Sequence, residues 1–334
     1  MSVVLHITSA WDTTTDLVIR DLDHMGVESV RLNTEAFPTR ARLTVTQQKG
    51  QLEGHLFTDS ARTLQLSNVR SVYYRRPETS SYDAFPDMSR ESQAFAAKES
   101  STALMSFLRC SQALWVNHPD ITGPAEDKVR QLQVAQDCGL TVPNTMVSND
   151  PERVLAFVEQ ANGAVVAKTI RSPRVSPKSA KNTSLAYTHF LREEDLTHLE
   201  SLQLAPCIFQ EYVPKEFELR VTVVGSDIFA AAIYSQENPD ARVDWRKPNY
   251  QDLRHEAFVL PPAIAANCIA LVQRFQLNFA AIDLIKCPGG QFVFLECNPN
   301  GEWAWIQAAT GLPISEALAR LLATGLTSKR ADAQ

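Results

Sequence analysis

The chain has 334 residues, 44% of them hydrophobic and 21% charged, which is the composition of a globular protein long enough for two or three domains. Its formal net charge of −6 gives no overall basic field, so only local basic patches are left as a route to nucleic acid. No apolar run reaches the length of a membrane span, the start carries no signal-peptide pattern, and the six cysteines are scattered, so we expect a reduced cytoplasmic protein bound to neither nucleic acid nor membrane.

The first 118 residues alternate strand and helix patterns, which is typical of a parallel α/β sheet. A hairpin is predicted at 42–57, with its turn at Lys49-Gly50. The patterns predict, in chain order, strands at 3–8, 27–33, 69–78 and 113–119 and helices at 12–26 and 88–109. The strand at 69–78 contains Arg75 and Arg76 near its end.

Two helix patterns come next. The first, at 123–145, has Pro124 in its first turn and Gly139 at its end, and the second, at 149–163, has Asp150 as its N-cap. They are followed by a strand at 164–170, a polar and basic loop at 171–184, and an acidic amphipathic helix at 191–202. We expect the loop, which is rich in Ser and Pro, to be mobile.

The C-terminal part is richer in strands, which is typical of an α+β domain. The patterns predict strands at 207–213, 218–225 and 228–236, a helix at 261–277, two strands on either side of Gly289-Gly290, and a closing helix at 314–325.

The Gly289-Gly290 turn places two carboxylates opposite each other. A two-residue or a four-residue loop gives the same register, in which Asp283 faces Glu296 and Asn298 shares their face. At roughly 5 Å and an effective dielectric near 20, the two charges repel by about 3 kcal/mol, more than the roughly 0.2–1 kcal/mol of a typical cross-strand pair. Either one carboxylate faces solvent or meets a basic residue, or the group binds a divalent cation; two carboxylates and an amide favour a Mg²⁺–nucleotide site.

The sequence contains no P-loop, no dinucleotide-binding glycine motif and no kinase signature. Two lysines stand out, Lys128 and Lys168. Lys168 is the one charge in an apolar strand, and it either extends its ammonium group to solvent or neutralises an anion. Residues 210–211 end a strand that could pair with an adenine edge. Glu218 and Arg220 point the same way, which suits ribose and phosphate or a surface ion pair.

These residues, in this order and approximate spacing, resemble the ATP-grasp superfamily: Lys128, Lys168, QEYV (210–213), ELR (218–220), Asp283 and ECN (296–298). Three further segments resemble the microviridin-type peptide macrocyclases, or graspetide synthetases: YYRRPE (73–78), SQENPDARVDWR (235–246) and ECNPNGEWAWI (296–306). The resemblance covers nearly the whole chain, and the three segments together are specific.

The resemblance implies an ATP-grasp fold, α/β followed by α+β. Its parts would be an N-terminal α/β domain at 1–118, a central lid subdomain at 119–205, a C-terminal domain at 206–328 that binds ATP and Mg²⁺ against the lid, and a tail at 329–334. ATP-grasp lids often carry a glycine-rich phosphate loop, whereas the matching loop at 171–184 has no glycine. There, Ser179, Lys181 and Asn182 are candidates to replace its backbone contacts.

The resemblance also implies residue roles. Lys128 and Lys168 would bind phosphates and adenine, and Gln210, Glu211 and Val213 would hold adenine. Glu218 would bind ribose, Arg220 and Lys168 would act in catalysis, and Mg²⁺ would be held by Asp283, Glu296 and Asn298.

The implied reaction phosphorylates an Asp or Glu side chain of a ribosomal precursor peptide with ATP, after which a Ser or Thr hydroxyl or a Lys amine closes an ester or amide ring. The implied partners are a leader and core peptide and a second copy in a homodimer. Glu193, Glu194 and Asp195 are candidates for the leader, although acidic residues also suit a solvated helix start. Arg75, Arg76 and Arg246 are candidates for acidic core residues, with structural ion pairs as the alternative.

Two other functions remain open at this point. One is an ATP-grasp ligase that adds an amino acid to a small molecule or a protein. The other is a non-catalytic nucleotide-binding or leader-binding protein, against which the intact set of candidate site residues speaks.

Overall fold

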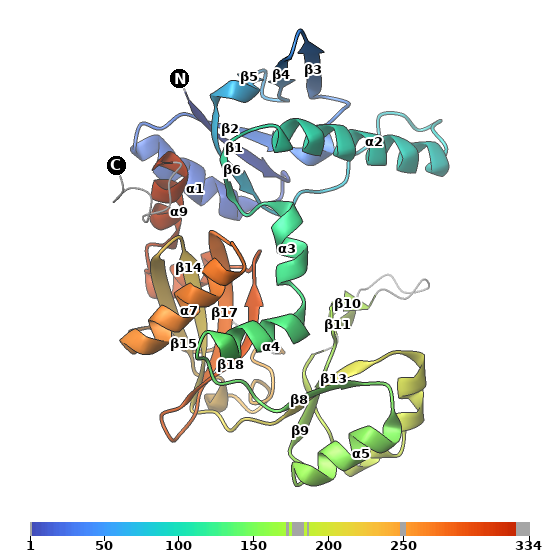
Figure 1. Ribbon diagram of the computed structural model, residues 1–334, viewed down its shortest axis with the longest axis vertical. Coiled ribbons are helices and arrows are strands. Elements are labelled where there is room, and N and C mark those ends of the chain that lie inside the picture. The colour runs from blue at the N-terminus through green and yellow to red at the C-terminus, as the bar shows by residue number, and fades with distance from the viewer. Residues whose placement is uncertain (1, 172–173, 176–183, 186, 248–251, 325–334) are drawn as a thin grey trace.

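The structure is a computed structural model that describes residues 2–171, 174–175, 184–185, 187–247 and 252–324. Figure 1 shows three sheet-containing units along the long axis, with the N-terminal unit at the top, a five-stranded sheet in the middle and a small sheet at the lower right. This arrangement confirms the expected mixed α/β architecture with an N-terminal α/β sheet.

The N-terminal unit is built on a parallel sheet of order β2-β1-β6-β7. The strands are β1 (Val3–Thr8), β2 (Ser29–Asn33), β6 (Val69–Tyr74) and β7 (Leu114–Val116). Helix α1 (Thr13–His24) begins where the Asp12 carboxylate accepts a hydrogen bond from the Thr14 amide, and α2 (Arg90–Arg109) precedes β7. The predicted hairpin is confirmed: β3 (Arg42–Gln48) pairs with β4 (Gln51–Phe57), which pairs with β5 (Thr63–Gln65).

One predicted helix is two in the structure. Helix α3 (Pro119–Ala125) contains Pro124, and α4 (Lys128–Asp137) starts afresh. The break has a local cause, because the Asp127 carboxylate accepts hydrogen bonds from the amides of Val129 and Arg130 and so caps α4. The prediction of one helix that starts at Pro124 is therefore wrong.

The small sheet has the order β12-β9-β13-β8 and forms the central unit with α5 (Pro151–Gln160). Its strands are β8 (Thr145–Ser148), β9 (Val165–Lys168), β12 (His189–Phe190) and β13 (Cys207–Glu211). A short pair, β10 (Arg174–Val175) and β11 (Ser184–Leu185), lies beside it. The acidic segment forms α6 (Glu193–Leu196) and the 3-10 helix η3 (Leu199–Leu204) instead of one helix.

The sheets divide the chain differently from the predicted boundaries at 118/119 and 205/206. Strand β13 pairs with β8 and β9, and its Phe209 packs with Val154 and Val165 in the core of the central unit. Helix α4 instead packs on the C-terminal sheet, where the Gln131 amide bonds both the N–H and the carbonyl of Cys297. Pairing and packing thus assign α4 to the C-terminal unit and β13 to the central unit.

The C-terminal unit is an antiparallel sheet of order β16-β15-β14-β17-β18. Its strands are β14 (Phe217–Val224), β15 (Asp227–Ile233), β16 (His255–Phe258), β17 (Phe279–Lys286) and β18 (Phe292–Asn298). Its helices in the described residues are α7 (Pro262–Arg274), α8 (Ala304–Thr310), α9 (Ile314–Thr324) and the 3-10 helix η4 (Ser235–Glu237). The 3-10 helices η1 (Thr34–Ala36) and η2 (Leu66–Asn68) lie in the N-terminal unit.

Helix α9 joins the C-terminal unit to the N-terminal unit. Leu318 and Leu322 of α9 share a hydrophobic cluster with Val18 and Leu22 of α1, and Figure 1 shows α9 beside α1. The two units therefore share a core and do not meet only through a linker.

The predicted register of the β17–β18 hairpin is confirmed at the two carboxylates, although the turn that precedes them differs from the prediction. Asp283 pairs with Glu296 and Ala281 with Asn298, as predicted. The turn, however, spans Pro288 to Gly290, because the Cys287 amide bonds the Gln291 carbonyl. A β-bulge at Leu295 then restores the predicted pairing between Asp283 and Glu296.

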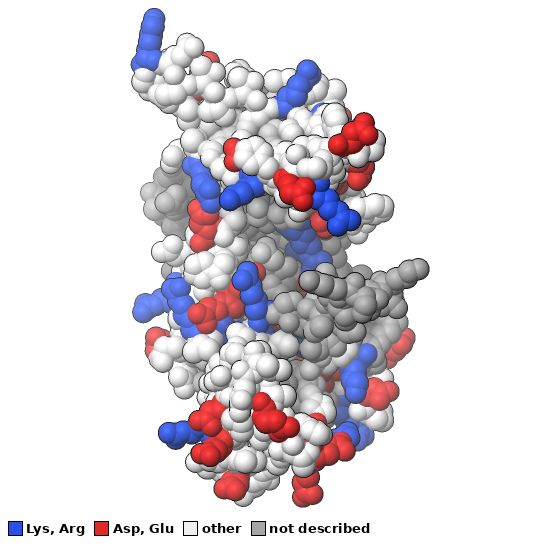
Figure 2. Space-filling view, turned by 90° about the vertical axis from the view of Figure 1, so that its right-hand side faces the viewer, with Lys and Arg blue, Asp and Glu red and all other residues white. Residues whose placement is uncertain are grey.

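Of the helices in the described ranges, none is both long enough and apolar enough to cross a lipid bilayer. On the face shown in Figure 2, acidic and basic side chains are interspersed, and acidic ones gather at the lower end. The surface charge on this face is therefore mixed.

Candidate active site

A cleft lies between the central and C-terminal units. It encloses about 880 Å³ of empty space, part of which is open to solvent, which is a size that suits a small-molecule ligand. Strands β9 and β13 form one wall, and β14, β17 and β18 form the other. Eight of the ten residues predicted for ATP and Mg²⁺ line it, all except Arg220 and Asn298: Lys128, Lys168, Gln210, Glu211, Val213, Glu218, Asp283 and Glu296.

The predicted pair of carboxylates is present at the floor of this cleft. Arg220 Nη1 lies 3.0 Å from Asp283 Oδ1, and Lys128 Nζ lies 3.5 Å from Glu296 Oε2. Burial raises the pKa of Asp283 to about 6, opposed by Arg220 and assisted by the Glu296 carboxylate. Burial acts in the same direction on Glu296, but Lys128 and Arg246 outweigh it and lower the pKa of that carboxyl.

The residues around this pair fit a divalent cation. Asp283 Oδ1 is buried and accepts no hydrogen bond of good geometry from the residues that the structure describes, which leaves a lone pair available. Within the described residues, no group of three His, Cys, Asp or Glu side chains is placed to hold a metal. A third protein ligand would therefore be an amide such as Asn298, whose Oδ1 accepts from the Asn300 amide at 2.9 Å and keeps a second lone pair.

Two lysines bring positive charge to the same cleft. Lys168 Nζ donates to Gln210 Oε1 at 2.7 Å, and Lys128 Nζ donates to the Thr169 carbonyl at 3.2 Å. Burial lowers the pKa of Lys168 to about 8, opposed by Glu296 and assisted by Lys128. An anion in the cleft would favour the charged form of Lys168.

The segment at 210–213 forms one edge of the cleft. The side chain of Gln210 is held between Lys168 and Thr145 Oγ1, and the Glu211 carboxylate accepts from Asn144 Nδ2 at 2.7 Å. The backbone amides of Glu211 and Tyr212 bond to Asn144 and Ala164. The Val213 amide donates to no carbonyl within the described residues, so it is available to an acceptor in the cleft.

Glu218, on β14, is buried in the wall of the cleft. Its carboxylate accepts from Lys215 Nζ at 2.5 Å and from the Ser235 hydroxyl, and Lys215 also bonds the Val243 carbonyl at 2.9 Å. Burial raises the pKa of Glu218, and Lys215 opposes this shift. Lys215 therefore links Glu218, the carboxylate predicted to bind ribose, to Val243, the residue before Asp244.

Arg246 also lines the cleft, which was not predicted for it. It contacts Asp244 through two hydrogen bonds of 2.8 and 2.7 Å, and Asp244 also accepts from the Thr188 amide at 2.9 Å. Burial alone would raise the pKa of Asp244, but Arg246 outweighs it and lowers the pKa to about 2. The positive charge of Arg246 is thereby fixed in the cleft, near Glu296 and Asp283.

Arg220 lies behind the cleft and does not line it. Its guanidinium is 5.6 Å from the ring centre of Trp245 and 5.9 Å from that of Trp305, with Asp283 at its tip. Such cation–π contacts hold the guanidinium in one place. In this structure Arg220 orients Asp283.

The other predicted residues lie outside the cleft. Arg75 is buried in ion pairs with Asp12 and Glu302, and Arg76 pairs with Glu302. Asp195 accepts from the Arg192 amide at the start of α6, as a helix-capping residue does, while Glu193 and Glu194 lie in its first turn. Ser179, Lys181 and Asn182 lie outside the described residues.

The sequence interpretation missed three residues that line the cleft, Lys215, Asp244 and Trp245, and one that supports Glu218 from outside it, Ser235. Lys215, Ser235, Asp244 and Trp245 contact predicted site residues, and three of them lie in the SQENPDARVDWR segment. The sequence did contain a signal for Asp244. An aspartate two residues before an arginine, as Asp244 stands before Arg246, can form an ion pair with that arginine within one turn of the chain. Nothing in the sequence pattern distinguishes Lys215 from a solvated lysine.

Comparisons with known proteins agree with this geometry. Residues 3–122 match the family model of the MvdD pre-ATP grasp domain, and residues 125–322 match that of the RimK-like ATP-grasp domain. A probable alpha-L-glutamate ligase 2 of Shewanella amazonensis is 24% identical over 213 residues, which cover 63% of this chain and 67% of that protein.

Two solved structures cover nearly the whole chain. A RiPP-associated ATP-grasp ligase of Chryseobacterium gregarium, in complex with ADP and a leader and core peptide, is 29% identical with a TM-score of 0.89 and covers 98% of both chains. The macrocyclase MdnC of Microcystis aeruginosa, bound with precursor peptide MdnA, is 32% identical with a TM-score of 0.84, over 97% of this chain and 100% of that one. The chain therefore belongs to the ATP-grasp superfamily, as a ligase with a pre-ATP-grasp domain and a RimK-like ATP-grasp domain, in the family that includes MdnC.

Proposed function

We propose that this ligase uses ATP and Mg²⁺ to join side chains within a ribosomally made precursor peptide, as a macrocyclase of the microviridin type. The observation that carries the proposal is the cleft, in which three cations surround two facing carboxylates: Lys128, Lys168 and Arg246 around Asp283 and Glu296. The likeness to two peptide-bound ligases along nearly the whole chain supports the peptide as substrate.

The nucleotide would lie across the cleft. The amide of Val213 is available to an adenine nitrogen, and Glu218, fixed by Lys215 and Ser235, presents carboxylate oxygens toward ribose hydroxyls. Lys128, Lys168 and Arg246 would then meet the phosphates, where their charges favour binding and the transition state. Asp283, Glu296 and Asn298 would hold Mg²⁺, which neutralises phosphate charge when it is bound.

The reaction needs positioning and charge more than an enzyme nucleophile. A carboxylate oxygen of the peptide attacks the γ-phosphorus, and the bond from that phosphorus to the bridging oxygen of ADP breaks. A hydroxyl or amine of the same peptide then attacks the acyl carbon, phosphate leaves and the nucleophile loses its proton. Arg220 contributes by holding Asp283 in place.

An oxygen-isotope experiment tests this chemistry. The substrate is sought as a short open reading frame beside the gene that encodes repeated Ser, Thr or Lys and Asp or Glu. That peptide is labelled with ¹⁸O in its side-chain carboxylates and incubated with enzyme, ATP and Mg²⁺. We expect one ¹⁸O atom in the released phosphate for each ring closed. Unlabelled phosphate would contradict an acyl phosphate.

The peptide would meet the enzyme at more than one place. We assign the core to the cleft mouth at Arg246, the leader to the acidic segment at 193–195, and a homodimer to the active form. We place the enzyme in the cytoplasm, because its six cysteines are all unpaired thiols. Arg75 and Arg76 are not assigned to the core, since their charges are taken by Asp12 and Glu302.

Addition of glutamate to another molecule is the second candidate, because curated relatives at 22–24% identity are glutamate ligases. The two functions differ in what starts ATP turnover. A macrocyclase releases ADP when the precursor is added and ignores free glutamate, whereas a glutamate ligase needs free glutamate in every assay.

A further inference from the structure

The loop at 299–302, which follows the proposed metal ligand Asn298, is held by the N-terminal unit. Asn117, just after β7, donates its side-chain amide to the carbonyls of Pro299 and Phe279, each at 2.8 Å. Arg75, just after β6, donates to the Gly301 carbonyl at 3.3 Å and to Glu302 Oε2 at 2.7 Å. Both ends of the loop are therefore fixed from outside the nucleotide cleft.

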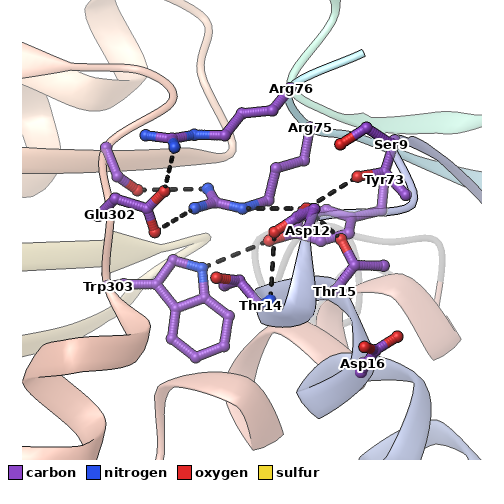
Figure 3. Close-up of polar contacts among 12 residues, drawn as sticks. Ser9, Asp12, Thr14, Thr15, Asp16, Tyr73, Arg75, Arg76, Glu302 and Trp303 are labelled. Atoms are coloured by element: carbon purple, nitrogen blue, oxygen red, sulfur yellow. Dashed lines mark hydrogen bonds and ion pairs between the residues drawn. The ribbon is translucent and has the colours of Figure 1, made fainter. Parts of the chain in front are cut away.

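Figure 3 shows the guanidinium of Arg75 between Asp12 of the N-terminal unit and Glu302 of the loop. Asp12 is itself fixed, because its Oδ2 accepts from Thr8 Oγ1 at 2.8 Å and from Thr15 Oγ1 at 2.6 Å. Arg75 is 2% exposed, so its charge depends on these two carboxylates and not on water. The four charged residues Asp12, Arg75, Arg76 and Glu302 are called the junction below.

The junction occupies a place where parallel sheets commonly bind ligands. Strand β1 lies between β2 and β6, so the connections after β1 and β6 leave in different directions and open a crevice at their carboxyl ends. Here the crevice contains Arg75 and Asp12, and the Glu302 carboxylate of the same chain binds Arg75 where a ligand would otherwise bind. The crevice therefore serves to attach the C-terminal unit.

The loop has little room to move relative to the metal-site strands. A Cβ atom on Gly301 would lie 2.4 Å from Ala281 Cβ, so the loop backbone touches β17 directly. Ala281 pairs with Asn298 and lies two residues before Asp283. Trp303, at the end of the loop, is fully buried, and its Nε1 lies 3.4 Å from Tyr73 Oη. A displacement of the loop would therefore displace Asn298 relative to Asp283 and Glu296.

We propose that Arg75 and Asn117 are positioning residues for metal binding: they hold residues 299–302 from the N-terminal unit and thereby fix the Asn298 amide beside Asp283 and Glu296. Neither residue lines the nucleotide cleft. The inference rests on the proposed metal site and gives the N-terminal domain a part in it.

The test measures Mn²⁺ binding, not activity. Full-length protein with a non-hydrolysable ATP analogue is titrated with Mn²⁺, and free Mn²⁺ is followed by electron paramagnetic resonance. Because outer partners of metal ligands typically contribute 10–100-fold to affinity, we expect Glu302→Gln to weaken Mn²⁺ binding by about tenfold. Affinity for the analogue without metal should stay within about twofold, since no cleft contact is lost, and Arg75→Lys should give an intermediate value because it keeps the charge.

A matched control separates positioning from general loosening. Arg70 also joins the two units, through a hydrogen bond to the Ala323 carbonyl of α9, but lies away from the loop. Arg70→Gln should keep the wild-type Mn²⁺ affinity. In an Asn298→Ala background, Glu302→Gln should cause no further loss, because the ligand that it positions is absent.

Two results would overturn the inference alone: Glu302→Gln that binds Mn²⁺ like Arg70→Gln, or an undiminished effect in the Asn298→Ala background. Wild-type protein that binds the analogue but no Mn²⁺ would overturn the proposed metal site and the inference together.

Discussion

The junction and the nucleotide cleft are both built from acidic and basic side chains around a buried centre, yet they are arranged in opposite ways. In the junction, Asp12 and Glu302 lie on different sides of Arg75, at 3.5 and 2.7 Å. In the cleft, Asp283 and Glu296 face each other across two paired strands. The junction balances two carboxylates with two arginines, whereas in the cleft the basic residues Lys128, Lys168 and Arg246 outnumber the two facing carboxylates, so the cleft has positive charge left for an anion.

The pKa values of two aspartates express this difference. Burial would raise the pKa of Asp12, but hydrogen bonds from Thr15 and Thr8 and the charge of Arg75 lower it overall. Burial raises the pKa of Asp283 to about 6 despite Arg220, because Glu296 adds to the effect. The lowered pKa of Asp12 is typical of a carboxylate in a structural ion pair, whereas the raised pKa of Asp283 is typical of a carboxylate in a binding site.

The largest expected effect on stability is in the junction. Arg75→Gln would leave the buried Asp12 carboxylate without its counter-charge, so we expect the free energy of unfolding to fall by about 3–5 kcal/mol. Urea denaturation measures it. A loss below about 1 kcal/mol would show that the junction is no more than a surface ion pair.

The opposite pattern is expected at the cleft. Glu296→Gln removes a proposed metal ligand, so peptide-dependent ADP release should fall by at least about 100-fold. The free energy of unfolding should fall by less than in Arg75→Gln, because relief of the repulsion from Asp283 offsets part of the lost attraction to Lys128 and Arg246. Coupled ADP assays and urea denaturation on one preparation measure both. Turnover near the wild-type rate would show that Glu296 is not a metal ligand.

The cleft should also respond to pH through Lys168. Burial lowers its pKa to about 8, so the protein without nucleotide loses this charge as pH rises above 8, and ATP affinity should then fall by up to about tenfold per pH unit. Because the unfolded chain keeps the proton up to higher pH, the same group should add stability over that range. Calorimetric titration between pH 7 and 9.5 measures the affinity, and Lys168→Arg should flatten the curve. A flat wild-type curve would show that Lys168 does not meet the phosphates.

The smallest effect is expected from the exposed half of the junction. Arg76 is 51% exposed and shares Glu302 with Arg75, so Arg76→Gln should lower the free energy of unfolding by less than about 1 kcal/mol. This variant is the control for Arg75→Gln in the same urea series. An equal fall in the free energy of unfolding for Arg76→Gln and Arg75→Gln would show that the buried and the exposed arginine contribute equally, against this account.

The sequence predicted the parallel N-terminal sheet and the hairpin at Lys49-Gly50, because these features follow from local alternation and turn residues. The pairing of Asp283 with Glu296 was also predicted, but its turn was not, and the pairing is reached through a β-bulge that the alternation pattern does not reveal.

The sequence did not predict that β13 belongs to the central unit, since strand partners depend on packing with residues such as Val154 and Val165 that are distant in sequence. The sequence could not decide between ion pairs and a peptide-binding role for Arg75 for the same reason, because its partners Asp12 and Glu302 lie far from it along the chain.

The mass of the product tests the proposed function most directly. The precursor peptide is incubated with the enzyme, ATP and Mg²⁺ and analysed by mass spectrometry, with fragmentation to locate the bonds. We predict the loss of one water for each side-chain bond, with nothing added to the peptide. An unchanged peptide, or one that gains the mass of an amino acid residue, would contradict the account.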